Sequence, residues 1–215
     1  MLGSYHIPPI PEALHDLYEV HNFRHAAEVL QTTCSDEYAE ICRALTKFRI
    51  TKDDILAPGG NESRIPKNVA SLLRPDGWYE TRVRGDLVVK IDTHGEEGIE
   101  RTEHCIEDFL DGHKIDFVKN RVAFDLEWNS KDQTFDRDLY AFRAFHEAGI
   151  ISAAILLTRS ASLNPVFKQL GIMSKYGAST TWMGKLLYRL RAGRHGGCPV
   201  LVLGITPKLI EDWQE

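Results

Sequence analysis

The sequence predicts an α/β fold in which a central mixed β-sheet is flanked by helices and preceded by an N-terminal helical extension. Helical apolar spacing dominates the first 55 residues, whereas strand-like and helix-like segments alternate after residue 80. A chain of 215 residues, 43% of them apolar, can bury one sizeable core. We therefore expect residues 1–215 to form a single domain, with a helical part at 1–55 and a core at 80–208.

The N-terminal part is predicted to contain two helices. Apolar residues recur at helical spacing over residues 11–30 and again over 35–48, where Asp36 and Glu37 suit a helix N-terminus. Turn residues then predict a loop at 57–66, and a short helix is predicted at 67–74.

The core is predicted to open with a strand at residues 82–93, where apolar and polar residues alternate. Three glutamates that share one face at helical spacing, Glu100, Glu103 and Glu107, favour a helix over residues 96–110. Beyond residue 130 the patterns predict a helix, a strand, a helix and a strand, at residues 136–147, 150–158, 180–191 and 199–205.

The most informative segment is a predicted hairpin over residues 115–128, which alternates apolar and polar positions around a turn at Lys119-Asn120. With that turn, Asp116 lies on the same face as Asp125 and diagonal to it, about 7 Å away, and Glu127 follows on the same face. Like charges gathered on a sheet face are destabilising, and a hard cation would reverse the sign of that cost. The alternative is an acidic strand face that is simply solvated.

Charge is unevenly distributed along the chain, whose net charge is −5. Residues 148–210 contain eight basic and no acidic side chains, so the remainder sums to −13. Such polarity favours a nucleic-acid or acidic-membrane surface, and the alternative is a solvated basic helix. Four cysteines without metal-ligand spacing indicate free thiols. Because no leader pattern or membrane-length apolar run is found, we expect a soluble intracellular protein without membrane contact.

The order of helix, acidic hairpin, helix and strand resembles the catalytic core of PD-(D/E)xK nucleases. More narrowly, the run Asp-Phe-Val-Lys-Asn-Arg-Val-Ala from Asp116 is similar to the BglII/BstYI type of Type II restriction endonuclease. Two later segments extend the resemblance, which covers residues 60–208: Tyr-Arg-Leu-Arg-Ala-Gly-Arg from Tyr188 and Pro-Val-Leu-Val-Leu-Gly-Ile from Pro199. It implies a restriction-endonuclease-like core.

The resemblance also implies roles for individual residues. Asp116 matches the metal-binding aspartate, and Asp125 matches the second carboxylate, where Glu is more usual. Glu127 stands where the superfamily has Lys and this branch has Gln, so its role as proton acceptor or metal ligand is open. The implied cofactor is Mg²⁺, which Mn²⁺ can replace, held by Asp116, Asp125 and the backbone carbonyl of Leu126. Glu103 or Glu100 could add a ligand, although a solvated helix face explains both glutamates as well.

Candidate DNA contacts fall into four groups of polar and basic residues. Base readout requires side chains with paired hydrogen-bonding groups, whereas isolated basic side chains contact phosphates. Ser and Thr at a helix start could instead be N-caps, and Arg137 and Asp138 could pair locally. The candidates are Asn129, Ser130 and Lys131 after the hairpin; Ser179, Thr180 and Thr181 before the basic helix; Lys185, Arg189, Arg191 and Arg194 on and after it; and Asn61, Ser63, Arg64 and Lys67 in the 57–74 region.

The resemblance implies sequence-specific cleavage of double-stranded DNA at a short palindrome with a GATC core, leaving 5′-phosphate overhanging ends. A palindromic site fits a homodimer, to which helix 136–147 could contribute unless its apolar residues pack in the core. The resemblance also implies a cytoplasmic enzyme of a prokaryote, with a companion DNA methyltransferase in the same host. The alternatives are a PD-(D/E)xK nuclease of DNA repair or modification-dependent cleavage, and a catalytically silent DNA-binding module.

Overall fold

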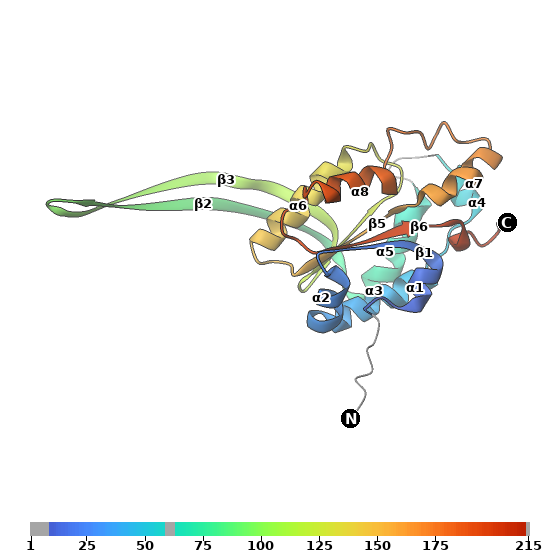
Figure 1. The fold of residues 1–215 in the computed structure, drawn as a ribbon, viewed down its shortest axis with the longest axis horizontal. Helices are drawn as coiled ribbons and strands as arrows, with labels where there is room; N and C mark the ends of the chain where they lie inside the picture. The colour runs from blue at the N-terminus through green and yellow to red at the C-terminus, as the bar shows by residue number, and fades with distance from the viewer. Residues whose placement is uncertain (1–8, 59–62, 214–215) are drawn as a thin grey trace, which may run out of the picture.

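The computed structural model describes residues 9–58 and 63–213, which form one six-stranded mixed sheet with helices on both faces (Figure 1). The strand order is β1-β6-β5-β4-β3-β2. Strands β4, β5 and β6 are parallel, and the other neighbouring pairs are antiparallel. The elements in chain order are α1 (Glu12–Leu17), β1 (Tyr18–Phe23), α2 (Ala26–Thr33), α3 (Ser35–Lys47), α4 (Lys52–Leu56), α5 (Arg64–Leu73), β2 (Tyr79–Gly95), β3 (Gly98–Lys119), β4 (Val122–Glu127), α6 (Thr134–Glu147), β5 (Ala153–Arg159), α7 (Asn164–Gln169), α8 (Met183–Arg191) and β6 (Val200–Ile205).

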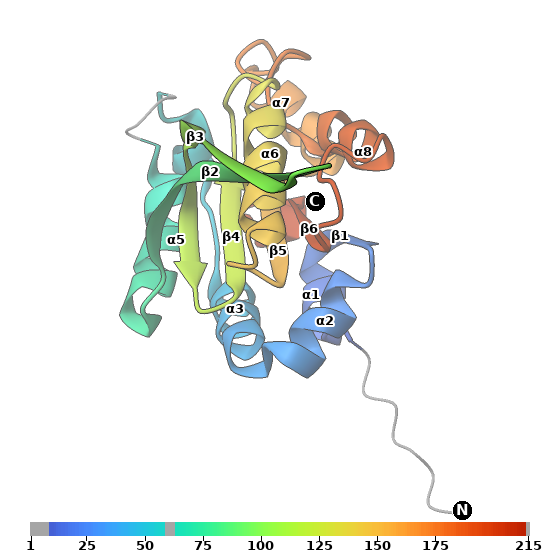
Figure 2. The same ribbon diagram turned by 90° about the vertical axis from the view of Figure 1, so that its left-hand side faces the viewer.

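Two apolar cores form because successive strand residues point to opposite faces of the sheet. In β4, Phe124 and Leu126 enter the core beneath the N-terminal helices, whereas Ala123 enters the core beneath α6 and α8. The two sets of helices lie on opposite sides of the sheet in Figure 2. The predicted central mixed sheet flanked by helices is thus confirmed.

The helix predicted over residues 11–30 is wrong, because the chain forms α1, β1 and α2 there. The apolar spacing of this segment is also compatible with strand β1, which pairs antiparallel with β6 at the edge of the sheet. Arg24 and His25 adopt left-handed backbone angles, φ 52° and 57°, which an α-helix cannot contain. The N-terminal part therefore contributes a strand to the same sheet as the core.

The helix predicted over residues 96–110 is also wrong, because these residues belong to β3. Strands β2 and β3 pair from Gly95 and Gly98 at a tight turn, and their outer part forms a two-stranded arm that projects from the body (Figure 1). The spacing of the glutamates suits a helix, but cross-strand pairing along residues 87–95 decides the structure.

The β3–β4 turn differs by one residue from the predicted one. Lys119 pairs with Val122, so the turn is Asn120-Arg121, and Asn120 has a positive φ of 47°. Phe117 pairs with Phe124, which sets Asp116 opposite Asp125 rather than diagonal to it. The two carboxylates are therefore closer neighbours than the sequence predicted.

The remaining predicted helices and strands exist with shifted ends. Helix α6 packs Leu139, Phe142 and Phe145 into the second core, so the core-packing interpretation of these side chains is the correct one. Helix α8 begins at Met183, without a side-chain N-cap. In residues 9–58 and 63–213, no helix is both long enough and apolar enough to cross a membrane.

Candidate active site

The candidate site lies where β3 leaves the arm and enters the central sheet. Between the pairs Tyr79–Val118 and Thr81–Ile115, one residue of β2 faces two of β3, Asp116 and Phe117. This β-bulge bends β3 where β3 meets β4. β-Bulges are common next to active sites. The bulge directs Phe117 into the core beneath the N-terminal helices and leaves Asp116 exposed.

Two carboxylates of β4 are buried beside Asp116. Asp125 is 3% exposed and Glu127 is 6% exposed. The Leu126 backbone N–H donates to Asp125 Oδ1 at 3.0 Å. The charge of Asp116 acts on Asp125 from the neighbouring strand.

A fourth acid, Asp138, completes the cluster from helix α6. It is 1% exposed, and it interacts electrostatically with Asp125 and Glu127. The local pair with Arg137 that the sequence allowed does form: Arg137 Nη2 lies 3.0 Å from Asp138 Oδ1. The same guanidinium nitrogen lies 3.6 Å from Glu127 Oε1, so Arg137 bridges the two acids.

One sequence signal could have identified Asp138. It lies on the apolar stripe of α6, three residues after Phe135 and four before Phe142, both of which are fully buried. An acid on the buried face of a helix needs a partner or a cation.

Burial and mutual repulsion raise the pKa of the buried acids. Burial is the largest cause for Asp125, followed by the charge of Asp138, and the pKa lies well above its usual range. Burial and then the charge of Glu127 raise the pKa of Asp138 in the same way. Burial also raises the pKa of Glu127, opposed by a hydrogen bond from Ser130 and by Arg137. The cluster therefore binds protons, or another cation, strongly.

The acidic cluster opens into two adjoining clefts of about 510 and 640 Å³, which share Pro66, Asp116 and Leu126. The first cleft is also lined by Glu127, Asn129 and Ser130, and the second by Lys67 at the start of α5. Asp116 therefore lies between the two clefts and lines both.

The donor set suits a hard divalent cation. Glu127 Oε2 and Asp138 Oδ2 are buried without a hydrogen-bond partner among the described residues, and buried polar atoms normally have one. Carboxylate and carbonyl oxygens are the ligands that Mg²⁺ uses. Over the described part of the chain, no three acidic, His or Cys side chains are already arranged as a closed metal cluster.

Glu100 and Glu103 lie on the projecting arm rather than on a helix beside the hairpin. Glu100 pairs across the ribbon with Thr93, and Glu103 lies opposite Lys90, 3.8 Å from its ammonium group. The arm extends away from the end of β3 that bears Asp116 (Figure 1). The acid that the structure adds to the cluster is Asp138.

The loop after β4 and the loop before α8 lie side by side. Lys131 and Thr180 form a β-bridge, and the Asp132 N–H donates to the Ser179 carbonyl at 2.9 Å. The Thr181 N–H donates to the Ser130 carbonyl at 2.9 Å, so the two predicted recognition loops are joined by backbone hydrogen bonds.

Thr180 and Thr181 form hydrogen bonds within these loops. Thr181 is fully buried, and its hydroxyl accepts from the Ser130 N–H. Arg159, buried on β5, donates to the Thr181 carbonyl and to the Thr180 hydroxyl; burial lowers the pKa of Arg159 to about 10. Sequence analysis did not single out this arginine, which holds the second loop in place. Ser130, Lys131 and Ser179 remain exposed.

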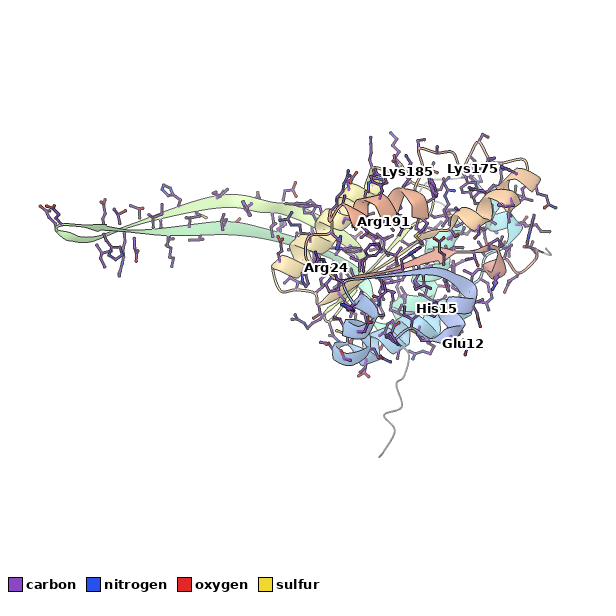
Figure 3. The ribbon with its side chains drawn as sticks, viewed as in Figure 1. Glu12, His15, Arg24, Lys175, Lys185 and Arg191 are labelled. Carbon is purple, nitrogen blue, oxygen red and sulfur yellow. The ribbon has the colours of Figure 1, made fainter. Side chains whose placement is uncertain are left out.

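The basic side chains on and after α8 differ in exposure and in ion pairing. Arg189 is buried and paired with Asp136 at 3.0 Å, and Arg194 pairs with the same carboxylate. Lys185 lies 3.4 Å from Asp132. Arg191 is exposed and has no ion pair among the described residues; Figure 3 labels it with Lys185 and Lys175. Acids from outside the segment thus neutralise part of the basic stretch.

The predicted contacts near α5 lie beside the second cleft. Arg64 and Lys67 are exposed in the first turns of α5, and Lys67 lines the cleft that Asp116 also lines. Ser63 lines the first cleft, whereas Asn61 lies outside the described residues.

Comparison with known proteins gives one family. The model of the restriction endonuclease BglII/BglIII family matches residues 18–205, from the first strand to the last. No curated protein matches the chain. The matched range contains the acidic cluster, both clefts and the two recognition loops. The chain therefore belongs to the BglII/BglIII family of restriction endonucleases and is a Type II site-specific deoxyribonuclease.

Proposed function

We propose that the protein hydrolyses phosphodiester bonds of double-stranded DNA at the acidic cluster in a Mg²⁺-dependent reaction, which Mn²⁺ also supports. One observation carries the proposal: Asp116, Asp125, Glu127 and Asp138 meet at the inner end of β3 and β4, and Asp116 and Glu127 line an open cleft. Buried acids with raised pKa values, here Asp125, Glu127 and Asp138, are typical of catalytic sites when they lie beside a cleft. Residues 1–215 would act as a single nuclease domain.

Asp116, Asp125 and the Leu126 carbonyl are the proposed metal-holding groups. A bound divalent ion supplies charge neutralisation at the phosphate and lowers the pKa of a water molecule. The chain itself contributes fixed positions for the two side chains: Asp125 is held by the Leu126 N–H, and Asp116 is held opposite it on the neighbouring strand.

Glu127 is the proposed proton acceptor for the attacking water. Burial raises its pKa, which favours proton acceptance near neutral pH. Arg137 lies 3.6 Å from Glu127 Oε1 with a side chain that is 64% exposed, so it can also reach a phosphate in the cleft. Asp138 fixes the guanidinium through hydrogen bonds to its Nε and Nη2 atoms.

Polar and basic groups of the two loops, of α5 and of α8 are the proposed DNA contacts. Asn129, Ser130, Lys131 and Ser179 would face base edges, with Thr180 and Thr181 shaping their loop through backbone bonds. Arg64, Lys67, Lys185 and Arg191 would contact phosphates. Arg189, which is buried and paired with Asp136, would hold this surface in place, whereas the exposed Arg194, paired with the same carboxylate, would contact a phosphate.

The proposed substrate is a short palindrome, with a GATC core as the first sequence to test and 5′-phosphate overhanging ends as the product. A palindrome is cut in both strands most simply by a two-fold homodimer. A companion methyltransferase in the host would protect the same sequence. This arrangement would operate in the cytoplasm, where host DNA lies.

Purified protein incubated with plasmid DNA tests the proposal. Discrete fragments are expected with Mg²⁺, none with EDTA, and none for Asp116→Asn in either condition. Glu103→Gln, a carboxylate of the arm, is the matched control and should cut like wild type. Metal-dependent but random degradation would overturn the sequence-specific part, and binding without cleavage would overturn the enzymatic part. End-labelling of the fragments then reads the site and the overhang.

A further inference from the structure

The second cleft is lined by two residues that take no part in the proposed cleavage chemistry, Arg74 and Tyr79. Arg74 directly follows α5, and Tyr79 begins β2. Lys67 of α5 lines the same cleft, whose volume is about 640 Å³. Because Asp116 lines both clefts, a ligand of the second cleft would lie next to the proposed cleavage site.

Helix α5 has an apolar face and a basic face. Ile65, Val69 and Leu73 are buried at helical spacing. Lys67 and Arg74 are separated by two helical turns, so they lie on one face about 10 Å from each other. Arg74 keeps helical backbone angles, φ −58° and ψ −38°, although it lies just beyond the helix. The basic face therefore borders the second cleft over two turns.

The two cations of this cleft are available to a ligand. Both are exposed, and neither forms an ion pair with a described residue. The next acids along the chain are already paired. Asp76 lies 3.1 Å from Arg43. Glu80, which also lines the cleft, lies 2.7 Å from Lys114. The cleft therefore keeps two uncompensated positive charges beside Asp116.

Tyr79 adds an exposed aromatic side chain to the same wall. It is 60% exposed on β2, the edge strand of the sheet, and it pairs with Val118 of β3. Tyrosine hydroxyls donate to phosphate oxygens in protein–DNA complexes, as lysine and arginine side chains do. Two free cations and a phenol hydroxyl along one cleft are complementary to a row of phosphates.

The two recognition loops lie on the other side of Asp116. Asn129 and Ser130 line the first cleft, whereas residues 129–131 and 179–181 of the described chain do not line the second. A DNA strand that faces these loops and has its scissile phosphate at Asp116 would continue into the second cleft. A 5′ overhang places the cut towards the outer end of a palindrome, so the strand beyond the cut soon leaves the recognised sequence.

We infer that the second cleft binds the DNA backbone that flanks the recognition sequence. Lys67 and Arg74 contact separate phosphates there, and the Tyr79 hydroxyl donates to a phosphate oxygen. The inference rests on the proposed function, because it extends the path of the DNA from the same cleavage site. Phosphate contacts carry no sequence information. Affinity should therefore depend on the length of the flanking DNA and not on its sequence.

Binding of two duplexes in EDTA, followed by fluorescence anisotropy, tests the inference. Both are centred on the same GATC-containing palindrome and span about one and about three helical turns, so the longer one alone supplies the flanking phosphates. Arg74→Gln should raise Kd about fivefold for the longer duplex and less than about twofold for the shorter one. The slope of log Kd against log[NaCl] should fall by about 0.9 for the longer duplex.

Three further variants serve as controls and repeats. Arg101→Gln makes the same change at an exposed cation of the arm, outside both clefts, and should leave both Kd values within about twofold. Lys67→Gln repeats the test at the second cation. Tyr79→Phe should cost about two- to threefold on the longer duplex alone, because it removes one neutral donor. Circular dichroism checks that each variant is folded.

Equal losses on the two duplexes for the folded Arg74→Gln and Lys67→Gln variants, an unchanged salt slope, or a loss that varies with flank sequence would each overturn the inference. Plasmid cleavage is scored separately. A protein that shows the flank-dependent losses but never cuts contradicts the proposed function alone. A protein that cuts at a specific site, and whose variants bind both duplexes like wild type, contradicts the flank contacts alone. A wild type that binds neither duplex contradicts both.

Discussion

The two ends of strand β3 carry acidic side chains in opposite environments. At the outer end, Glu103 faces solvent and Lys90, and the carboxylate is solvated. At the inner end, Asp116 lies beside Asp125, Glu127 and Asp138, three acids that are at most 6% exposed. The number of carboxylates is larger on the arm, yet it is at the inner end that burial raises the pKa of Asp125, Glu127 and Asp138 and leaves Glu127 Oε2 and Asp138 Oδ2 without a partner among the described residues. Burial, rather than the number of acids, distinguishes the inner cluster from the acidic surface of the arm.

The largest effect is expected from Asp125→Asn. This substitution removes a proposed metal-holding carboxylate. The value of kcat/KM for a cleaved duplex should therefore fall about a thousandfold, equivalent to about 4 kcal/mol. Glu103→Gln makes the same chemical change on the arm and should alter kcat/KM less than twofold. Steady-state cleavage of a labelled duplex measures both. Equal behaviour of the two variants would remove the distinction between the two ends of β3.

Asp138→Asn should have the next largest effect. Asp138 positions Arg137 and contributes to the charge that holds a cation, but it is not among the proposed metal-holding groups. We expect kcat/KM to fall about ten- to a hundredfold. Because a positioning role acts through Arg137, Arg137→Ala in the Asp138→Asn background should add little further loss. Full activity of Asp138→Asn would show that the buried acid is structural only.

The pH dependence of stability gives a third comparison. In EDTA, the raised pKa values of Asp125 and Asp138 mean that the folded state keeps protons which the unfolded state has released. The free energy of unfolding should therefore fall as pH rises above about 4, by up to about 1.4 kcal/mol per pH unit for each retained proton. Mg²⁺ should restore stability at neutral pH.

Urea unfolding at pH 5 to 8 measures this slope. Asp125→Asn should flatten it, whereas Asp92→Asn on the arm should leave it unchanged, because that carboxylate lies at the protein surface. A wild-type slope of zero or of opposite sign would contradict the raised pKa values of Asp125 and Asp138.

The smallest effect is expected from a truncation of the arm, on the stability of the body. Replacing residues 88–105 by Asn-Gly removes side chains that are largely exposed, so the free energy of unfolding of the monomer should change by about 1 kcal/mol or less. Thermal unfolding at low protein concentration, with circular dichroism as the signal, checks this. A loss of several kcal/mol would mean that the arm supports the central sheet.

The acidic hairpin was predictable because strand alternation is local. Parity along β4 sets Asp125 and Glu127 on one face, and the sequence alone indicated this. The exact turn was not predictable to one residue, because both Lys119-Asn120 and Asn120-Arg121 are compatible with the alternation. Pairing with Phe124 decided the register and brought Asp116 opposite Asp125.

The two incorrect helix predictions have the same cause. Residues 11–30 and 96–110 have spacings that suit a helix, but each segment contains a strand whose partner lies far away or was not recognised. β1 pairs with β6, about 180 residues later in the chain, and that contact has no local sequence signal.

The sequence by itself determined the α/β class, the acidic hairpin and the basic C-terminal segment, because periodicity and charge are properties of neighbouring residues. Only the tertiary structure decided that Asp138 joins the cluster and that Arg189 forms an ion pair with Asp136. It also decided that the glutamates of residues 96–110 lie on a two-stranded arm. Each of these depends on how helices and strands distant in the chain pack together, and burial of a charged group is set by that packing rather than by its neighbours in sequence.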